Sequence, residues 1–187
     1  MKPTSYALVL GVAMVAAVAC RQASHPAATT NAVERGRYLV TTMGCNDCHT
    51  PWKLGERGPE PDMTRMLSGH PQAMKLPPPP ALPPGPWGFT GTLTMTAWAG
   101  PWGISYTANL TPDDETGIGA WSEQNFIQGM RTGQHLGSGR PILPPMPWNW
   151  YGKMSDGDLR AIFVYLKSIP PIRNQVPAPV PPAQAGT

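Results

Sequence analysis

The chain has 187 residues and a formal net charge of +3, which fits one domain of ordinary size with extended flanks. Prolines number 25, about 13% of the chain against a usual ~5%, and only 13% of residues are charged. A hydrophobic content of 41% still supports a compact core and excludes a wholly disordered chain, while the weak, unclustered positive charge excludes a nucleic-acid surface. Three cysteines, an odd number, do not make a pure disulfide framework.

Residues 1–19 predict an export signal. Lys2 lies in a short basic start, and the apolar run that follows it is shorter than the ~20 residues that cross a bilayer as a helix. The run ends in small residues and then Cys20, an arrangement that resembles a bacterial lipoprotein signal. We therefore expect Cys20 to be lipidated and the mature chain to lie on the periplasmic side of a bacterial membrane. Ordinary cleavage after an alanine, which leaves Cys20 as a free thiol, is the alternative.

The flanks of the predicted domain have a different composition from its centre. Residues 20–31 are small and polar and predict a flexible tether. Residues 173–187 are rich in proline and predict an extended tail. One domain is therefore expected over residues 32–172.

Three helices are predicted inside this domain. The first covers residues 31–43, with Asn31 and Glu34 as a capping-box pair. The second begins after the cap Ser122 and ends at Gly133. The third follows the cap Ser155, and its apolar positions keep helical spacing until two prolines end it: Leu159, Ile162, Phe163, Leu166 and Ile169.

Residues 71–88 hold eight prolines, which exclude a helix interior and predict polyproline conformation along the surface. Four aromatic residues near this insertion are expected to pin it to the domain: Trp87, Phe89, Trp98 and Trp102. No long alternating run indicates a sheet. The predicted fold class is therefore all-α, with three main helices and long proline-rich loops.

The sequence Cys45-x-x-Cys48-His49 is typical of c-type haem attachment. The two thiols at this spacing form thioethers to the haem vinyl groups, and the adjacent histidine becomes the proximal iron ligand. A zinc site would need a second ligand pair, and a thioredoxin-like dithiol would need a βαβ context. The motif and the export signal together predict one covalently bound haem c, held by Cys45, Cys48 and His49.

Met146 is the predicted second axial ligand of the iron. It lies in Pro144-Pro145-Met146-Pro147-Trp148, where the prolines make a stiff, non-helical segment that directs the thioether. Met154 is the main competitor, and His70 and His135 are further alternatives. A His/Met pair indicates an electron carrier of raised reduction potential, whereas an open position would permit small-molecule binding.

Beyond the haem motif, the chain resembles the cytochrome c domains of multihaem dehydrogenase subunits and related monohaem lipoproteins. The resemblance covers roughly residues 32–175 and rests on the motifs at residues 36–40, 45–51, 109–113, 116–119, 121, 145–148 and 158–166. It implies an all-α cytochrome c fold with His49 and Met146 as axial ligands. It also implies that Gly36 lets the first helix cross closely against Ile162 and Tyr165.

Several residues near these motifs are candidates for the surroundings of the haem. Arg140 and Trp148 are candidate partners of a haem propionate. The expected walls of the pocket are apolar: Leu110, Ile118, Trp121 and Leu143.

The predicted function is that of an exported monohaem cytochrome c that carries single electrons between redox proteins, without catalytic turnover of its own. Two alternatives remain open. The chain could be the electron-accepting subunit of a membrane-associated dehydrogenase complex, or a haem sensor or peroxidase with a labile sixth ligand.

Overall fold

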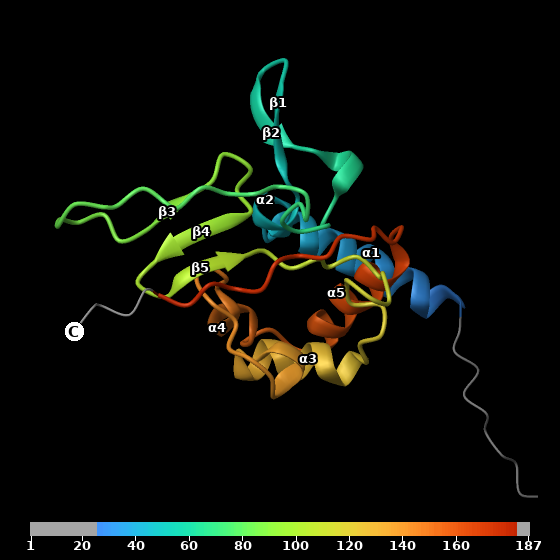
Figure 1. The fold of residues 1–187 in the computed structure, drawn as a ribbon. Helices are drawn as coiled ribbons and strands as arrows, with labels where there is room; N and C mark the ends of the chain where they lie inside the picture. Colours follow the sequence, from blue (N-terminus) through green and yellow to red (C-terminus); the bar gives the residue numbers. More distant parts are fainter. Residues whose placement is uncertain (1–25, 183–187) are drawn as a thin grey trace, which may run out of the picture.

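A computed structural model describes residues 26–182, so the predicted export signal and Cys20 lie outside the described residues. Helices α1, α3 and α5 gather on one side of the molecule, and a small sheet extends from the other side (Figure 1). The elements in chain order are α1 (Pro26–Thr42), α2 (Cys45–His49), β1 (Trp52–Gly55), β2 (Gly58–Pro61), the 3-10 turn η1 (Met63–Arg65), β3 (Thr90–Gly91), β4 (Ala97–Gly100), β5 (Gly103–Tyr106), α3 (Glu123–Thr132), the 3-10 turn η2 (His135–Gly137), α4 (Trp148–Tyr151) and α5 (Asp156–Ser168).

The second and third predicted helices are confirmed as α3 and α5. The Ser122 side chain caps α3 and forms a reciprocal capping box with Asn125, while Gly133 ends the helix with φ 68°. The Ser155 hydroxyl accepts a hydrogen bond from the backbone N–H of Asp158 at the start of α5.

The first predicted helix exists, but its predicted start was wrong. Helix α1 begins at Pro26 and therefore includes part of the range 20–31 that was expected to be a flexible tether. Asn31 lies inside the helix, and Glu34 forms an ion pair with Arg37 at 2.6 Å instead of closing a capping box. Proline is well suited to the first turn of a helix, because it has no N–H there to leave unpaired.

The expectation of an all-α fold is also wrong, because the described residues contain two antiparallel sheets. Strands β1 and β2 form a hairpin in which Gly55 is opposite Gly58, and β3, β4 and β5 form a three-stranded sheet in that order. The strands have only two to four residues, too few to show an alternating pattern in the sequence. The three-stranded sheet lies between the haem motif and Met146 in the sequence.

The proline-rich insertion, residues 71–88, contains no helix or strand. The ring of Phe89 packs against Trp98 and Trp102, with centroids 6.1 and 6.0 Å apart, and so ties the end of the insertion to the sheet as expected. Trp87, by contrast, is 74% exposed and does not pin the insertion.

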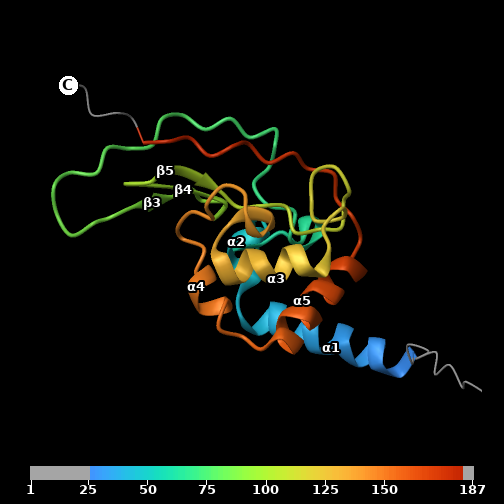
Figure 2. The ribbon, with the colours of Figure 1, turned by 90° about the horizontal axis from the view of Figure 1, so that it is seen from below.

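The segment after α5 is extended, and it packs against the domain rather than leaving it. Val180 pairs with Ile104 of β5, and Asn174 is buried. The Asn174 amide donates to the carbonyls of Ser68 and His70 and accepts from the N–H of Gln72. The segment therefore runs beside the start of the proline-rich insertion and reaches the three-stranded sheet (Figure 2).

The hydrophobic core lies between α1, α3 and α5. At Gly36 of α1, a Cβ atom would lie 2.0 Å from the carbonyl oxygen of Ala161 and 2.6 Å from Cβ of Tyr165. The expected close crossing of α1 and α5 is therefore present, although Ala161 rather than Ile162 takes the place nearest to the glycine. The buried members of the core are Leu39, Val40, Leu67, Ile118, Phe126, Ile127, Leu159, Ile162, Phe163, Leu166 and Ile169.

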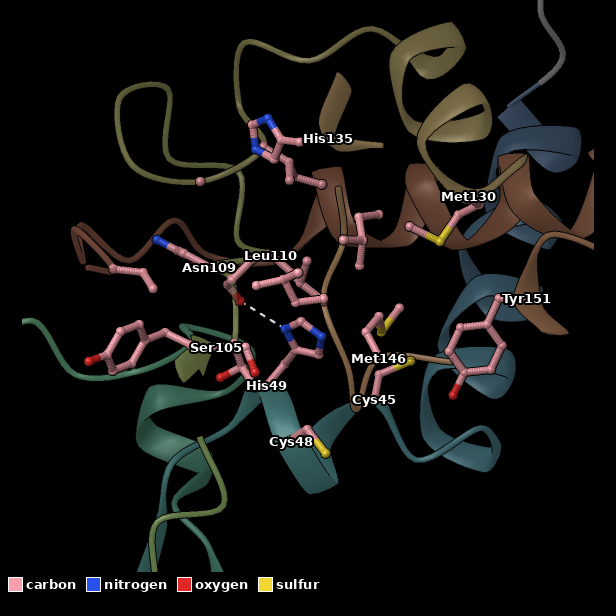
Figure 3. Close-up of a pocket in the computed structure, with 18 of the residues that line it drawn as sticks. Cys45, Cys48, His49, Ser105, Asn109, Leu110, Met130, His135, Met146 and Tyr151 are labelled. Atoms are coloured by element: carbon pink, nitrogen blue, oxygen red, sulfur yellow. Dashed lines mark hydrogen bonds between the residues drawn. The ribbon is translucent and has the colours of Figure 1, made fainter. Parts of the chain in front are cut away.

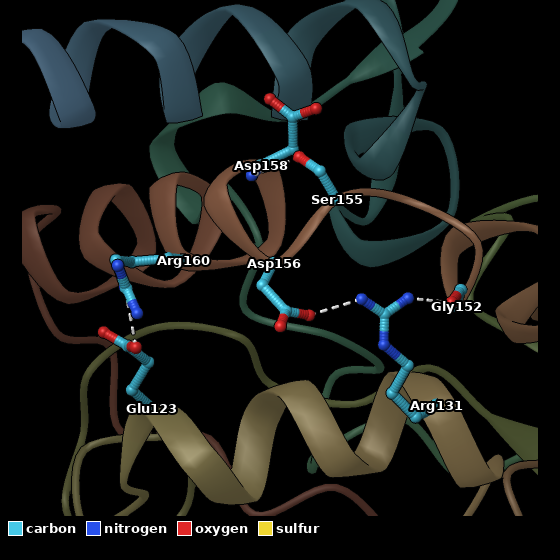
Figure 4. A network of polar contacts seen from close by, with 7 residues as sticks. All are labelled: Glu123, Arg131, Gly152, Ser155, Asp156, Asp158 and Arg160. Carbon is cyan, nitrogen blue, oxygen red and sulfur yellow. Dashed lines mark hydrogen bonds and ion pairs between the residues drawn. The ribbon is translucent and has the colours of Figure 1, made fainter.

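Ion pairs connect α3 with α5 at the surface (Figure 4). Arg160 pairs with Glu123 at 2.8 Å, and Arg131 pairs with Asp156 at 2.5 Å. Arg131 also donates to the carbonyl of Gly152, just before α5. Because these pairs are exposed, each contributes roughly 0–1 kcal/mol, and burial of the core remains the larger source of stability.

Among residues 26–182, the helices are either too short or too polar to cross a membrane.

Replacing Gly36 with alanine is expected to lower the free energy of unfolding by about 1–3 kcal/mol, the usual cost of overpacking a tight contact. The clash with the Ala161 carbonyl outweighs the ~1 kcal/mol by which alanine is the better helix former. Denaturant unfolding measures the change. Gly88→Ala is the matched control, since no atom lies within 4 Å of its added methyl group; equal stability of the two variants would contradict the prediction.

Candidate functional site

A cavity with a volume of about 450 Å³ and a mostly apolar lining lies within the described residues. This volume falls within the ~300–1,000 Å³ that is usual for cofactor sites. Its walls come from the end of α1, from α2, from β5 and the loop after it, from α3 and from residues 140–147 (Figure 3). The extended segment 175–179 completes the lining.

Helix α2 carries Cys45, Cys48 and His49 along one wall of this cavity. Gly44 precedes it with φ 69°, a left-handed conformation that lets the chain turn from α1 into α2 with only two residues between them. Both cysteines are free thiols. Burial raises the pKa of Cys45 to about 11, and burial together with the Asp47 carboxylate raises the pKa of Cys48. At neutral pH the wall therefore presents two uncharged thiols three residues apart.

His49 is buried and held in one orientation. Its Nδ1 lies 2.8 Å from the carbonyl oxygen of Ala108, and because a carbonyl only accepts, Nδ1 must carry the proton. The other ring nitrogen, Nε2, then has a free lone pair, and it makes no hydrogen bond among the described residues. Burial lowers the pKa of His49 and so favours the neutral ring. A neutral imidazole whose Nδ1–H is bonded to a carbonyl is the usual form of a metal-binding histidine.

Met146 also lines the cavity, from the proline-flanked segment between η2 and α4. Figure 3 shows its side chain and that of His49 within the same space. Met154, the expected competitor, is not part of the lining and packs against the hydrophobic core. Met43 and Met130 do line the cavity, and no local signal in the sequence singles them out.

The two alternative histidines have different environments. His70 lies outside the cavity lining and is fully buried, with Nδ1 3.0 Å from the hydroxyl of Thr96. His135 lines the cavity, and its ring meets the ring of Trp121 edge-on, with centroids 4.8 Å apart. Of these two candidates, His135 is therefore the one that shares the cavity with His49.

The expected apolar walls are confirmed as lining residues: Leu110, Ile118, Trp121 and Leu143. Arg140 also lies at the cavity, but Trp148 does not and packs over Gly133 instead. Trp98 of β4, which was expected only to anchor the insertion, lines the cavity as well. Its indole Nε1–H is buried without a hydrogen-bond partner among the described residues.

These residues fit a haem c group. The apolar walls suit the flat macrocycle, and two thiols with two residues between them suit the two vinyl groups. The unpartnered Nε1–H of Trp98 and the guanidinium of Arg140 suit the carboxylates of the group. A buried donor without a partner costs stability. A carboxylate of a bound group would supply the acceptor that the indole N–H of Trp98 lacks.

Tyr151 ties the two sides of the cavity together. It lies on α4, just after the Met146 segment, and its hydroxyl donates to the carbonyl of Met43 at 3.0 Å. Met43 follows directly after α1, two residues before Cys45. Burial raises the pKa of Tyr151, so its hydroxyl remains a donor at neutral pH.

Comparison with known proteins shows similarity to dehydrogenase subunits, although no protein-family model matches the chain. The chain is 31% identical over 165 residues to the gluconate 2-dehydrogenase cytochrome c subunit of Pantoea cypripedii, covering 88% of this chain and 28% of that subunit. It is 26% identical over 148 residues to the cytochrome c subunit of the quinone-dependent alcohol dehydrogenase of Gluconobacter oxydans, covering 79% and 23%. A shorter stretch of 78 residues is 41% identical to a nicotinate dehydrogenase subunit of Pseudomonas putida, covering 42% and 6%.

These similarities define the chain as carrying a cytochrome c domain, an electron-transfer module that binds haem iron. The domain resembles those of the cytochrome subunits of gluconate, alcohol and fructose dehydrogenases. The chain spans only about a quarter of the length of these subunits.

Replacing Tyr151 with phenylalanine is expected to lower the free energy of unfolding by about 1 kcal/mol, because the carbonyl of Met43 loses its donor. Tyr38→Phe is the matched control, since Tyr38 is 58% exposed and its hydroxyl makes no hydrogen bond among the described residues. Chemical denaturation of the holoprotein measures both changes. A Tyr151→Phe variant as stable as the parent would show that this bond does not hold the two walls together.

Proposed function

We propose that the chain holds one haem c and carries single electrons between redox proteins. The observation that carries this proposal is the α2 wall, where Cys45, Cys48 and His49 face an apolar cavity and the Ala108 carbonyl leaves Nε2 of His49 free. In this proposal Cys45 and Cys48 would hold the haem through thioether bonds, and His49 would bind its iron through Nε2.

Met146 is the proposed second axial ligand. Its proline-flanked backbone is non-helical on both sides, and its side chain shares the cavity with His49. Met130 of α3 and Met43, just after α1, both pack against the hydrophobic core. A thioether ligand raises the reduction potential and closes the sixth position to small molecules, which suits a carrier rather than a sensor or peroxidase.

The remaining roles belong to the walls of the cavity. Haem, once bound, supplies one-electron redox chemistry. Trp98 and Arg140 are proposed to bind its carboxylates, because one is a buried donor without a partner among the described residues and the other is a cation at the same cavity. The apolar walls exclude water, which keeps the local dielectric low and tunes the potential.

A second candidate function is that of an electron-accepting subunit in a membrane-associated dehydrogenase complex. The observation in its favour is the similarity to cytochrome subunits of three dehydrogenases. In either function the chain transfers electrons and leaves substrate turnover to a partner. The export signal at residues 1–19 and lipidation of Cys20 would place it on the periplasmic side of a membrane. Copurification with a dehydrogenase, followed by reduction of the haem on addition of that enzyme's substrate, would favour the subunit role.

The double variant Cys45→Ala/Cys48→Ala is expected to lose covalent haem, because no thiol remains at the α2 wall. Haem staining of a denaturing gel and extraction with acidified acetone measure the attachment. Cys20→Ala is the matched control and should keep haem fully attached, since Cys20 lies outside the haem motif. Haem that stays attached in the double variant would overturn the proposal.

Met146→Ala is expected to abolish the weak charge-transfer band between a methionine sulfur and ferric iron, and to let the reduced protein bind carbon monoxide rapidly. The physical reason is that the substitution removes the proposed sixth ligand and leaves the position open. Met154→Ala, outside the cavity, is the control and should keep the band. Absorbance spectra of the oxidised protein measure the band, and spectra of the reduced protein measure carbon monoxide binding. A band that persists in Met146→Ala would reject Met146 as the ligand.

A further inference from the structure

Ser105 on β5 connects the three-stranded sheet with the segment that carries Met146. Its side chain is only 7% exposed, and its hydroxyl donates to the carbonyl of Pro144 at 2.6 Å. The indole Nε1–H of Trp102 lies 3.3 Å from the same hydroxyl and donates to it. Since Trp102 supplies the proton on that side, the hydroxyl's own proton is directed toward Pro144. A second carbonyl, that of Trp98, lies farther away at 3.4 Å.

Residues 144–147 can form few other hydrogen bonds to the rest of the domain. Three of its four residues are prolines, so Met146 has the only backbone N–H in it. That N–H closes a turn onto the carbonyl of Leu143 at 3.3 Å, which is a bond within the loop itself. Hydrogen bonds from other elements must therefore reach the segment through its carbonyl oxygens.

Backbone hydrogen bonds hold the chain just before the segment and at its last residue. The N–H of Ile142 donates to the carbonyl of Gly133 at 2.8 Å, and the carbonyl of Pro147 accepts from the N–H of Trp150 at 3.0 Å in α4. The bond from Ser105 to Pro144 attaches the first residue of the segment to β5, which also lines the cavity. The turn is therefore held from both sides, two residues from Met146.

We propose that Ser105 is a positioning residue for Met146, and that the chain of bonds from Trp102 through Ser105 to Pro144 keeps the thioether at the iron. This inference rests on the proposed role of Met146 as an axial ligand. It gives the three-stranded sheet a function, because β5 holds the loop that carries Met146 through the bond from Ser105 to Pro144. Loss of the brace leaves the haem attached but makes Met146 easier to displace.

The test is a titration of the ferric holoprotein with imidazole, which competes with Met146 for the iron. Ser105→Ala is expected to bind imidazole about five- to tenfold more tightly than the parent, the change that corresponds to one hydrogen bond of ordinary strength. Trp102→Phe keeps an aromatic ring at this position but removes the indole N–H that donates to Ser105, so a smaller change in the same direction is expected. If Ser105→Ala fails to fold, the imidazole titration of Trp102→Phe still tests the proposal.

Thr94→Ala is the matched control. Its hydroxyl is also part-buried, belongs to the loop between β3 and β4, and bonds only to Thr92 and Thr96 among the described residues. Imidazole affinity in this variant should equal that of the parent, even if its thermal stability falls. An equal gain in Thr94→Ala and Ser105→Ala would mean a general loosening of the sheet and would overturn the positioning role.

The results also separate this inference from the proposed ligand. If Met146→Ala loses the charge-transfer band while Ser105→Ala and Trp102→Phe bind imidazole as the parent does, the ligand is supported and the positioning role is overturned. If Met146→Ala keeps the band, both are overturned.

Discussion

The hydrogen bond between Nδ1 of His49 and the carbonyl of Ala108 is the contact on which the site depends. It joins α2, which carries the two thiols, to the loop that follows β5, fifty-nine residues later in the chain. It fixes both the tautomer and the direction of the imidazole, so that Nε2 is free to bind a metal. The backbone supports this arrangement from the other side, because the N–H of Gly69 donates to the carbonyl of His49 itself.

The other walls of the cavity are assembled around this contact by elements that are distant in sequence. Helices α1 and α5 cross closely at Gly36 and form the base of the core, while Tyr151 holds α4 to Met43, just after α1. The three-stranded sheet adds the hydroxyl of Ser105 and the indole of Trp98.

The parts of the fold that were predicted correctly have strong local signals. Caps at Ser122 and Ser155 define the starts of α3 and α5, because a side-chain oxygen there satisfies a backbone N–H that the helix leaves unpaired. The sheets were missed because strands of two to four residues carry no readable period, and because their pairing is set by partners elsewhere in the chain. For the same reason Trp98 was interpreted only as an anchor, although its side chain also lines the cavity.

The sequence by itself indicated the class of site, since two cysteines and a histidine at this spacing are typical of c-type haem attachment. It also singled out Met146 among ten methionines, because flanking prolines constrain the backbone locally. Only the tertiary structure decided that Met146 shares the cavity with His49 while Met154 and His70 do not. Only the tertiary structure, likewise, placed Ala108, Ser105 and Trp98 in the lining of this cavity. The physical reason is that covalent spacing fixes short-range geometry, whereas the choice of partner across the cavity depends on packing between segments that are far apart in the chain.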